Sequence, residues 1–265
     1  RHTRYISVTG VQTCALSDLV IAVDFIRRDY LDPRIDFIYS YDLMNVIEHY
    51  ENDIECVFHE GAISSTTETN WSKLWNKNIQ YTLTLMLYCI EKNIPFQYAS
   101  SASVYGNPTE EQWSNPNKEL NPLNLYAQSK THIDKFVSEK KPDSLVQGMR
   151  YFNVYGPNED HKGNQSSPHH KFRQQFEGTG RIKLFEGSKG FYRDFIHIDE
   201  IIQKKLYCLE NKPSGFYDVG TGKPTSFYDV ALEIGGSDDV IDWIPMPDNL
   251  KEHYQKYTCA NMSWL

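Results

Sequence analysis

The chain has 265 residues, of which 40% are hydrophobic and 23% are charged, and its formal net charge is −8. This composition is that of an ordinary soluble globular protein, and it excludes a collagen, a coiled coil or a disordered chain. The Lys and Arg residues are scattered among acidic ones, which argues against a nucleic-acid-binding protein because phosphate affinity needs clustered basic residues. We therefore expect a small-molecule partner.

The start of the chain carries an abnormal signal. Val8-Thr9-Gly10 looks like a strand entering a nucleotide-binding glycine loop, but the residues that follow supply no further glycines. The run 8–19, VTGVQTCALSDL, instead resembles the translation of a sequencing-library adapter. We predict that residues 1–19 are non-native and that the natural sequence begins near Val20. The first strand, the glycine turn and the following helix of a nucleotide-binding fold are then expected to be missing.

The sequence gives little indication of a membrane span, of disulfide bonds or of a zinc site. No apolar run approaches the ~18 residues of a membrane span, so we expect a cytoplasmic protein with no membrane partner. The cysteine count is odd and no pair is spaced as CxxC, which disfavours a disulfide framework and a zinc cluster. We interpret the cysteines as buried thiols: Cys14, Cys56, Cys89, Cys208 and Cys259.

Strands and helices alternate from Val20 onward. The apolar patterns predict strands at 20–24, 35–41, 54–59, 95–100 and 145–152, and helices at 43–50, 71–92, 126–140, 199–210 and 227–234. This rhythm predicts an α/β fold with a doubly wound parallel sheet, Rossmann-like, and a smaller C-terminal substrate-binding lobe. The expected parts are a dinucleotide-binding domain at 20–155 with pieces of 191–220, and a mainly substrate-binding lobe at 156–265 that is truncated at its C-terminus.

Three residues are candidates for acid–base chemistry. Tyr126 and Lys130 have a YxxxK spacing, which places both side chains on one face of a helix. Ser101 closes a strand 25 residues earlier and is expected at the same sheet edge. A nearby ammonium would lower the pKa of the Tyr phenol from ~10 toward neutral, while the Ser hydroxyl would orient a substrate oxygen. Such a trio removes a hydroxyl proton as a hydride leaves.

Further motifs narrow the class of protein. They are FHEGAISSTTE at 58–68, RYFNVYGP at 150–157, HKG at 161–163, LFEGS at 184–188, RDF at 193–195 and FYDVGTG at 216–222. From Val20 onward the chain resembles the extended short-chain dehydrogenase/reductase superfamily, and is most similar to its ADP-L-glycero-D-manno-heptose 6-epimerases. The resemblance implies an isomerase of nucleotide-sugar and lipopolysaccharide metabolism that inverts C6 of an ADP-activated heptose through a transient ketone. It also implies tightly bound NADP, with NAD possible, and a homo-oligomer when full length.

The same resemblance assigns roles to individual residues. Tyr126 would be one catalytic base, Ser101 the hydroxyl-orienting group and Lys130 the residue that contacts the cofactor ribose. Lys162 would be the second acid or base, because the sugar presents opposite faces for hydride removal and return. Cofactor contacts are implied for Asp24, Phe25, Glu60, Gly61, Ala62, Ile63, Ser64, Asn78, Lys130, Val154 and Lys162. Substrate contacts are implied for Ser101, Asn153, Asn164, Lys171, Phe185, Glu186, Gly187, Ser188, Arg193 and Tyr254.

Several alternatives stay open on the residues alone. Lys162 is also consistent with an ordinary solvated lysine, and Arg193 with a structural pair to Asp194 or Asp199. An acid such as Asp24 at a strand end favours NAD, whereas Arg27-Arg28 could accept a 2′-phosphate. The adjacent His169-His170 pair lacks a third ligand, so we predict no metal site. The chain could also be another nucleotide-sugar epimerase or dehydratase, or a non-catalytic dinucleotide-binding fragment.

Overall fold

The computed structural model describes residues 4–8, 20–27, 31, 35–50, 52–115, 117–248 and 254–265. The chain forms two compact units. Unit 1 comprises Arg1–Gly106, Leu120–Arg150 and Ile202–Tyr217, and unit 2 comprises Asn107–Glu119, Tyr151–Ile201 and Asp218–Leu265. No helix within the described residues is both long and apolar enough to span a membrane.

A seven-stranded sheet organises unit 1, in the order β11-β6-β5-β4-β1-β2-β3. The strands are β1 (Arg4–Val8), β2 (Val20–Asp24), β3 (Asp36–Tyr39), β4 (Ile54–His59), β5 (Phe96–Ser101), β6 (Val146–Tyr151) and β11 (Gly215–Val219). The pairings β3–β2, β2–β1, β1–β4 and β4–β5 are parallel. Consecutive parallel strands need helical crossovers, so the sheet is the Rossmann-like parallel sheet that the alternating pattern predicts.

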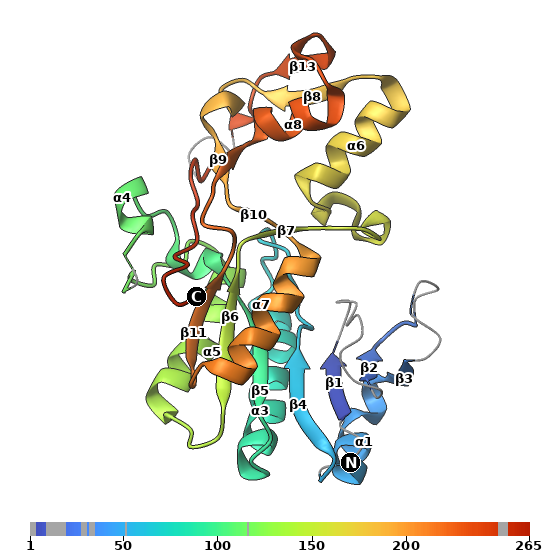
Figure 1. Cartoon of the computed structure of the whole chain (residues 1–265), viewed down its shortest axis with the longest axis vertical. Coiled ribbons are helices and arrows are strands. Elements are labelled where there is room, and N and C mark those ends of the chain that lie inside the picture. The colour runs from blue at the N-terminus through green and yellow to red at the C-terminus, as the bar shows by residue number, and fades with distance from the viewer. Residues whose placement is uncertain are drawn as a thin grey trace. The chain divides into compact units, whose positions relative to one another are not determined.

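The expectation of a missing first strand is wrong. Strand β1 lies inside the sheet, between β2 and β4 (Figure 1). Its backbone register pairs Tyr5 with Val20 on one side and with Cys56 on the other. Without a strand between them, β2 and β4 would each have backbone N–H and C=O groups without hydrogen-bond partners. The segment 4–8 supplies that strand and pairs with both. The predicted absence of the glycine turn and its helix concerns residues 9–19, which lie outside the described residues.

Helices cover both faces of this sheet. They are α1 (Leu43–Tyr50), α2 (Trp71–Leu74), the π-helix η2 (Trp75–Gln80), α3 (Tyr81–Glu91), α5 (Leu125–Lys140) and α7 (Ile198–Asn211). Neighbouring residues of a strand point to opposite faces. On β5, the Gln97 amide donates to the Lys205 carbonyl of α7 at 2.8 Å, while the Tyr98 hydroxyl donates to Asp134 of α5 at 2.8 Å. Figure 1 shows α7 in front of the strands and α3 and α5 behind them.

Local capping fixes where the helix with the YxxxK pair begins. The Asn124 side chain accepts a hydrogen bond from the Ala127 N–H at 2.8 Å, so α5 starts at Leu125. The helix ends at Lys141, which adopts a left-handed conformation with φ 44°. Tyr126 therefore sits in the first turn, next to the carboxyl end of β5, and Lys130 follows one turn later.

Unit 2 is built from short strands and helices around its own core. Its elements include α4 (Glu110–Trp113), β7 (Asn153–Tyr155), η4 (Asp160–Gln165), α6 (Pro168–Thr179), β8 (Ile182–Phe185), η5 (Ser188–Gly190), β9 (Tyr192–Arg193), β10 (Phe195–His197), β12 (Thr225–Ser226), α8 (Phe227–Gly235), η6 (Asp238–Val240) and β13 (Ile241–Ile244). The buried side chains of Phe172, Ile182, Leu184 and Val230 form its hydrophobic core. β7 pairs with β10, β8 with β13 and β9 with β12.

Candidate active site

Unit 1 brings the three predicted acid–base residues together. Ser101 is the last residue of β5, and its hydroxyl accepts from the Ser103 N–H at 3.2 Å, which starts the short helix η3 (Ala102–Tyr105). The Tyr126 hydroxyl makes a side-chain hydrogen bond with Ser101. Lys130 Nζ donates to the Ala99 carbonyl at 2.6 Å and lies 6.0 Å from the centroid of the Tyr126 ring. One sheet edge and one helix face thus hold hydroxyl, phenol and ammonium in a single cluster.

The electrostatics of the cluster differ from the sequence-based expectation. Burial raises the pKa of Tyr126, and the hydrogen bond with Ser101 opposes this rise only in part. The expectation of a lowered Tyr126 pKa is therefore wrong for the protein by itself, because desolvation outweighs an ammonium 6.0 Å from the ring. Burial also lowers the pKa of Lys130 to about 8, although the charges of Glu60 and Asp134 favour its protonated form.

The loop after β4 carries the predicted dinucleotide contacts from Glu60 to Ser64. Asn78, fully buried on η2, clamps this loop: its Oδ1 accepts the Ile63 N–H at 2.8 Å and its Nδ2 donates to the Ile63 carbonyl at 3.0 Å. The same Nδ2 lies 3.0 Å from Ser129 Oγ on α5. Asn78 therefore fixes the loop to the helix that bears Tyr126 and Lys130.

Glu60 has a protein partner in the structure. Its Oε1 accepts from Lys205 Nζ of α7, and the two side chains are 4% and 6% exposed. The Lys205 ammonium also lies 4.5 Å from the Phe58 ring centroid. This buried ion pair joins the carboxyl end of β4 to α7. The Glu60 side chain therefore has a structural role in holding these two elements together.

Asp24 and Phe25 lie at the carboxyl end of β2, as predicted. The Asp24 carboxylate accepts the Phe25 N–H at 2.6 Å, and the Phe25 ring is 62% exposed. Lys77 Nζ lies 5.2 Å from that ring, and the Arg27 guanidinium lies 6.0 Å from the Phe37 ring. A carboxylate, an exposed aromatic ring and two cations thus surround this strand end, while Arg28 lies outside the described residues.

Unit 2 holds the predicted residues of the His161-Lys162-Gly163 region. Lys162 lies on η4, its side chain is 42% exposed, and its Nζ is 3.4 Å from Glu159 Oε2. Lys171 Nζ donates to the Asn164 carbonyl at 2.7 Å, so these two predicted substrate contacts are neighbours. Asn153 and Val154 lie on β7, where the Asn153 N–H donates to the Asp194 carbonyl at 3.0 Å.

A second group in unit 2 gathers the predicted ADP contacts. Phe185 ends β8, Glu186 follows it with its N–H bonded to the Ile244 carbonyl at 2.9 Å, and Gly187 turns the chain into η5 with φ +88°. Ser188, which begins η5, is buried. Beyond this turn, the Phe191 ring lies 4.9 Å from the Tyr254 ring.

Arg193 completes this second group. Its guanidinium is 5.3 Å from the Tyr254 ring centroid, and it donates to the carbonyl oxygens of Tyr192 and Gln255. Asp194 instead accepts hydrogen bonds from Thr221, Gly222 and Ala260, and Asp199 lies 3.3 Å from His197. The alternative of a structural pair between Arg193 and either acid is therefore wrong.

Two acidic residues that lie close to the predicted lysines were not identified from the sequence. Asp134, one turn after Lys130 on α5, accepts hydrogen bonds from Tyr98 and from Arg150. Glu159, three residues before Lys162, is buried and accepts from Ser167 and Gly156. The only available signal is spacing, since each acid lies one helical turn or less from a predicted catalytic lysine.

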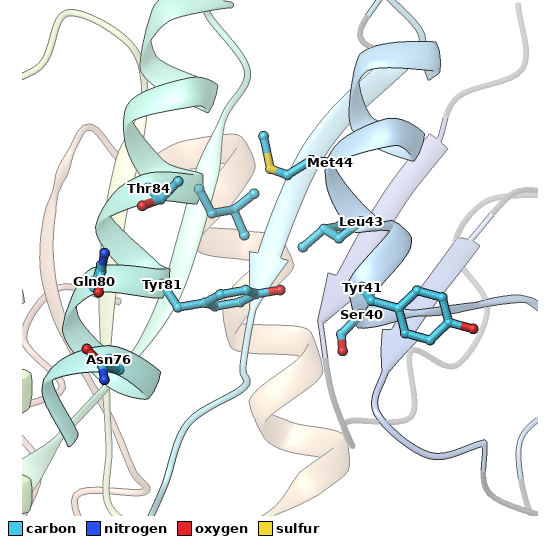
Figure 2. Close-up of a pocket in the computed structure, with 9 residues that line it drawn as sticks. Ser40, Tyr41, Leu43, Met44, Asn76, Gln80, Tyr81 and Thr84 are labelled. Atoms are coloured by element: carbon cyan, nitrogen blue, oxygen red, sulfur yellow. The ribbon is translucent and has the colours of Figure 1, made fainter. Parts of the chain in front are cut away.

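A cavity of about 240 Å³ lies between α1 and α3 (Figure 2). It is lined by Ser40, Tyr41, Leu43, Met44, Asn76, Gln80, Tyr81, Thr84 and Leu85. Figure 2 shows the Tyr81 ring extending from α3 toward Leu43 and Tyr41. The predicted site residues are not among its lining residues, so this cavity is separate from the candidate active site.

The remaining groups considered in the sequence analysis are possible metal ligands and cysteine thiols. Within the part of the chain that the structure describes, no three His, Cys, Asp or Glu side chains are grouped so that they could hold a metal ion. Cys56, Cys89 and Cys208 are free and buried, and burial raises the pKa of Cys89 and of Cys208 to about 12. The prediction of buried thiols is confirmed for these three, whereas Cys259 is half-buried and Cys14 lies outside the described residues.

Ser101 at the end of a parallel strand, and Tyr126 and Lys130 in the first turns of helix α5, form one acid–base cluster on an α/β fold. Residues 9–220 match the model of the NAD dependent epimerase/dehydratase family. The chain belongs to this family.

Named relatives agree with this membership. The chain is 41% identical over 245 residues to the ADP-L-glycero-D-manno-heptose-6-epimerase of Brachyspira hyodysenteriae. The aligned region covers 90% of this chain and 76% of that protein. The crystal structure of the Helicobacter pylori enzyme of the same name is 26% identical, with a TM-score of 0.82 over 99% of this chain and 88% of that one. A UDP-N-acetylglucosamine 4-epimerase from Methanobrevibacter ruminantium shares the fold at 20% identity, with a TM-score of 0.86 over 99% and 90% of the two chains.

Proposed function

We propose that this protein is an isomerase that inverts C6 of an ADP-activated heptose, with NADP as its bound cofactor. The observation that carries the proposal is the hydrogen bond between Tyr126 and Ser101, with the Lys130 ammonium 6.0 Å from the Tyr126 ring centroid. The 41% identity to a heptose 6-epimerase supports the choice of substrate. The product would serve the synthesis of lipopolysaccharide or another heptose-containing glycan.

The residues of unit 1 suit the first half of such a reaction. The Ser101 hydroxyl would hold the heptose O6, and the Tyr126 phenolate would take the O6 proton. When bound, the oxidised dinucleotide would supply hydride acceptance and return at C6, and the positive charge of its nicotinamide ring. That charge and the Lys130 ammonium would together favour the Tyr126 phenolate, which burial disfavours in the protein alone.

Lys162 would serve the second half of the reaction. The ketone at C6 must receive a hydride on its opposite face, so its oxygen then points toward a different proton donor. The ammonium of Lys162, whose side chain is 42% exposed and lies on a short helix, can supply that proton. We therefore propose Tyr126 and Lys162 as the two acid–base groups for the two orientations of the sugar.

The environment of Arg193 supports an ADP-binding role. The side chain is buried, and burial lowers its pKa, because a desolvated guanidinium is costly without a negative partner. Among the residues that the structure describes, its hydrogen-bond acceptors are the neutral carbonyls of Tyr192 and Gln255. A diphosphate would compensate this charge with bidentate geometry, and the adjacent Tyr254 ring would contact the nucleotide.

The donor set at the end of β2 fits a dinucleotide ribose. Asp24 suits the hydroxyls of NAD, whereas Arg27 suits the 2′-phosphate of NADP. We favour NADP, and the comparison of the dissociation constants of NADP and NAD for the wild type and for Arg27→Ala tests this choice. Weaker NADP binding with unchanged NAD binding in the variant supports it, and tighter binding of NAD by the wild type refutes it.

Location and assembly complete the proposal. The free buried thiols are typical of a reducing compartment, which supports a cytoplasmic enzyme. The proposal also includes a homo-oligomer of the full-length protein, as the resemblance implies.

The direct test is to incubate the purified chain with NADP and ADP-D-glycero-D-manno-heptose and to separate the two C6 epimers by chromatography. We expect both epimers at equilibrium, from either starting epimer. Conversion of a UDP-hexose but not of the ADP-heptose would make the protein another nucleotide-sugar epimerase. Dinucleotide binding without any conversion would instead favour a non-catalytic role.

A further inference from the structure

We propose that Glu159 is a positioning residue that holds the 156–167 loop closed and aims the Lys162 ammonium for the reaction. This inference rests on the proposed function, in which Lys162 is the second acid–base group. Glu159 acts through Lys162 and through the loop backbone, so it is not itself a catalytic residue.

The contacts of the Glu159 carboxylate span the whole loop. Oε1 accepts the Gly156 N–H at 3.2 Å and the Ser167 hydroxyl at 2.7 Å. Oε2 accepts the Ser167 N–H at 2.8 Å and lies 3.4 Å from Lys162 Nζ. A single side chain therefore joins the first residue of the loop, its last residue and the lysine within it.

The burial of Glu159 makes these contacts strong. Its side chain is 3% exposed, whereas the Lys162 side chain is 42% exposed. A buried carboxylate without partners would be unstable, so the loop must close around it. Burial by itself would raise the pKa of Glu159, but the Ser167 hydroxyl and N–H and the Lys162 ammonium outweigh it, and the pKa lies below its ordinary value. Glu159 is therefore charged while it holds the exposed lysine.

The backbone of the loop supports the same arrangement. The Lys162 N–H donates to the Glu159 carbonyl at 2.9 Å, and the Ser166 N–H and hydroxyl donate to the Gly163 carbonyl at 3.1 and 2.8 Å. Ser167 then caps α6, with its hydroxyl accepting from the His170 N–H at 3.2 Å. The loop thus ends on a rigid helix, which limits the positions that the Lys162 ammonium can reach.

A double-mutant cycle separates positioning from a general structural effect. Glu159→Gln keeps the shape of the side chain but removes its charge, and Lys162→Met removes the ammonium. We expect Glu159→Gln to lower kcat roughly 10- to 100-fold with little change in KM. In the Lys162→Met background the same change should have no further effect on kcat. An equal loss in both backgrounds, or no loss in either, would overturn the proposal.

The matched control is Asp160→Asn, which removes an exposed carboxylate from the same loop. The Asp160 side chain is 83% exposed, 3.6 Å from His170, and it plays no part in the proposed reaction. We expect its kcat to equal that of the wild type. A loss as large as that of Glu159→Gln would show that any charge change in the loop has this effect, which would contradict a specific role for Glu159.

Hydrogen exchange tests the loop independently of activity. In Glu159→Ala the Ser167 N–H loses its acceptor, so we expect the amides of 156–167 to exchange at least about ten times faster than in the wild type and in Asp160→Asn. Unchanged protection would overturn the proposal. If the wild type did not epimerise ADP-heptose, the proposed function would fail, and the exchange data would still show whether Glu159 orders the loop.

Discussion

The Arg150 guanidinium and the Asp134 carboxylate form a buried ion pair, with 2.9 Å between Nε and Oδ2. Asp134 also accepts the Tyr98 hydroxyl at 2.8 Å, and Arg150 Nη1 donates to the Tyr105 hydroxyl at 2.8 Å. The pair thereby joins α5, β5, β6 and η3. These elements hold Ser101, Tyr126 and Lys130, so the ion pair supports the whole acid–base cluster.

Loss of this ion pair should destabilise the fold strongly. Asp134→Asn keeps the size of the side chain but leaves the Arg150 charge buried without a carboxylate. We expect the free energy of unfolding to fall by about 3–5 kcal/mol, measured by denaturant titration. The exposed Asp160→Asn serves as control and should change stability by less than about 0.5 kcal/mol. A loss below about 1 kcal/mol for Asp134→Asn would show that the pair contributes little.

Removal of the Tyr126 hydroxyl should abolish most of the epimerase activity without unfolding the protein. Tyr126→Phe keeps the ring but loses the group that takes the O6 proton, so we expect kcat to fall by about 10²- to 10⁴-fold. The matched control is Tyr41→Phe, since Tyr41 is 78% exposed and lies outside the proposed site. Equal kcat values for Tyr126→Phe and the wild type would exclude Tyr126 as the base.

His59 should make the fold sensitive to mild acid. Burial, with a smaller contribution from the Lys130 charge, lowers its pKa to about 3. Between pH 6.5 and 3 the unfolded chain binds a proton at His59 and the folded chain does not, so stability falls as the pH falls through this window.

The variant His59→Gln isolates this effect, because it removes the titrating ring and can still bond Thr82, which lies 2.8 Å from His59 Nε2. From pH 6.5 to 5 the wild type should lose about 2 kcal/mol more stability than this variant. Parallel pH profiles of unfolding free energy for the two proteins would be incompatible with a depressed His59 pKa.

Gly163 should resist substitution for conformational reasons alone. It adopts φ 53° and ψ −124°, and a Cβ there would meet no atom within 4 Å. Gly163→Ala should therefore lower the free energy of unfolding by about 1–3 kcal/mol through backbone strain, or shift the Lys162 loop and lower kcat.

Gly178 in α6 is the control, because a Cβ there would also meet open space but its φ is ordinary. Gly178→Ala should stabilise by up to about 1 kcal/mol, and equal effects of the two substitutions in chemical denaturation would contradict this reasoning.

The fold of unit 1 could be predicted because its signals are local and strong. Apolar strands such as 54–59 and the periodic helix at 126–140 match β4 and α5 to within one residue. The YxxxK spacing and the strand end at Ser101 also predicted which side chains meet. Parallel order then follows from the alternation of strands and helices.

Other features depend on tertiary context. Strand β1 was missed because the sequence around it looked foreign, although a parallel sheet needs a strand between β2 and β4. Helix α6 was missed because Phe172 is its only buried residue, so its apolar pattern is weak. The raised Tyr126 pKa and the contacts of Glu159 depend on burial, which spacing along the chain does not reveal.

The most direct test of the proposed reaction is to run the epimerisation in D₂O and to measure deuterium at C6 of the product by NMR. In the proposed reaction the hydride that leaves C6 is returned to C6, and Tyr126 and Lys162 would exchange only the O6 proton with solvent. We therefore predict both epimers with no deuterium at C6. Deuterium at C6 in the epimerised product would contradict the account, because inversion would then proceed by proton abstraction from carbon.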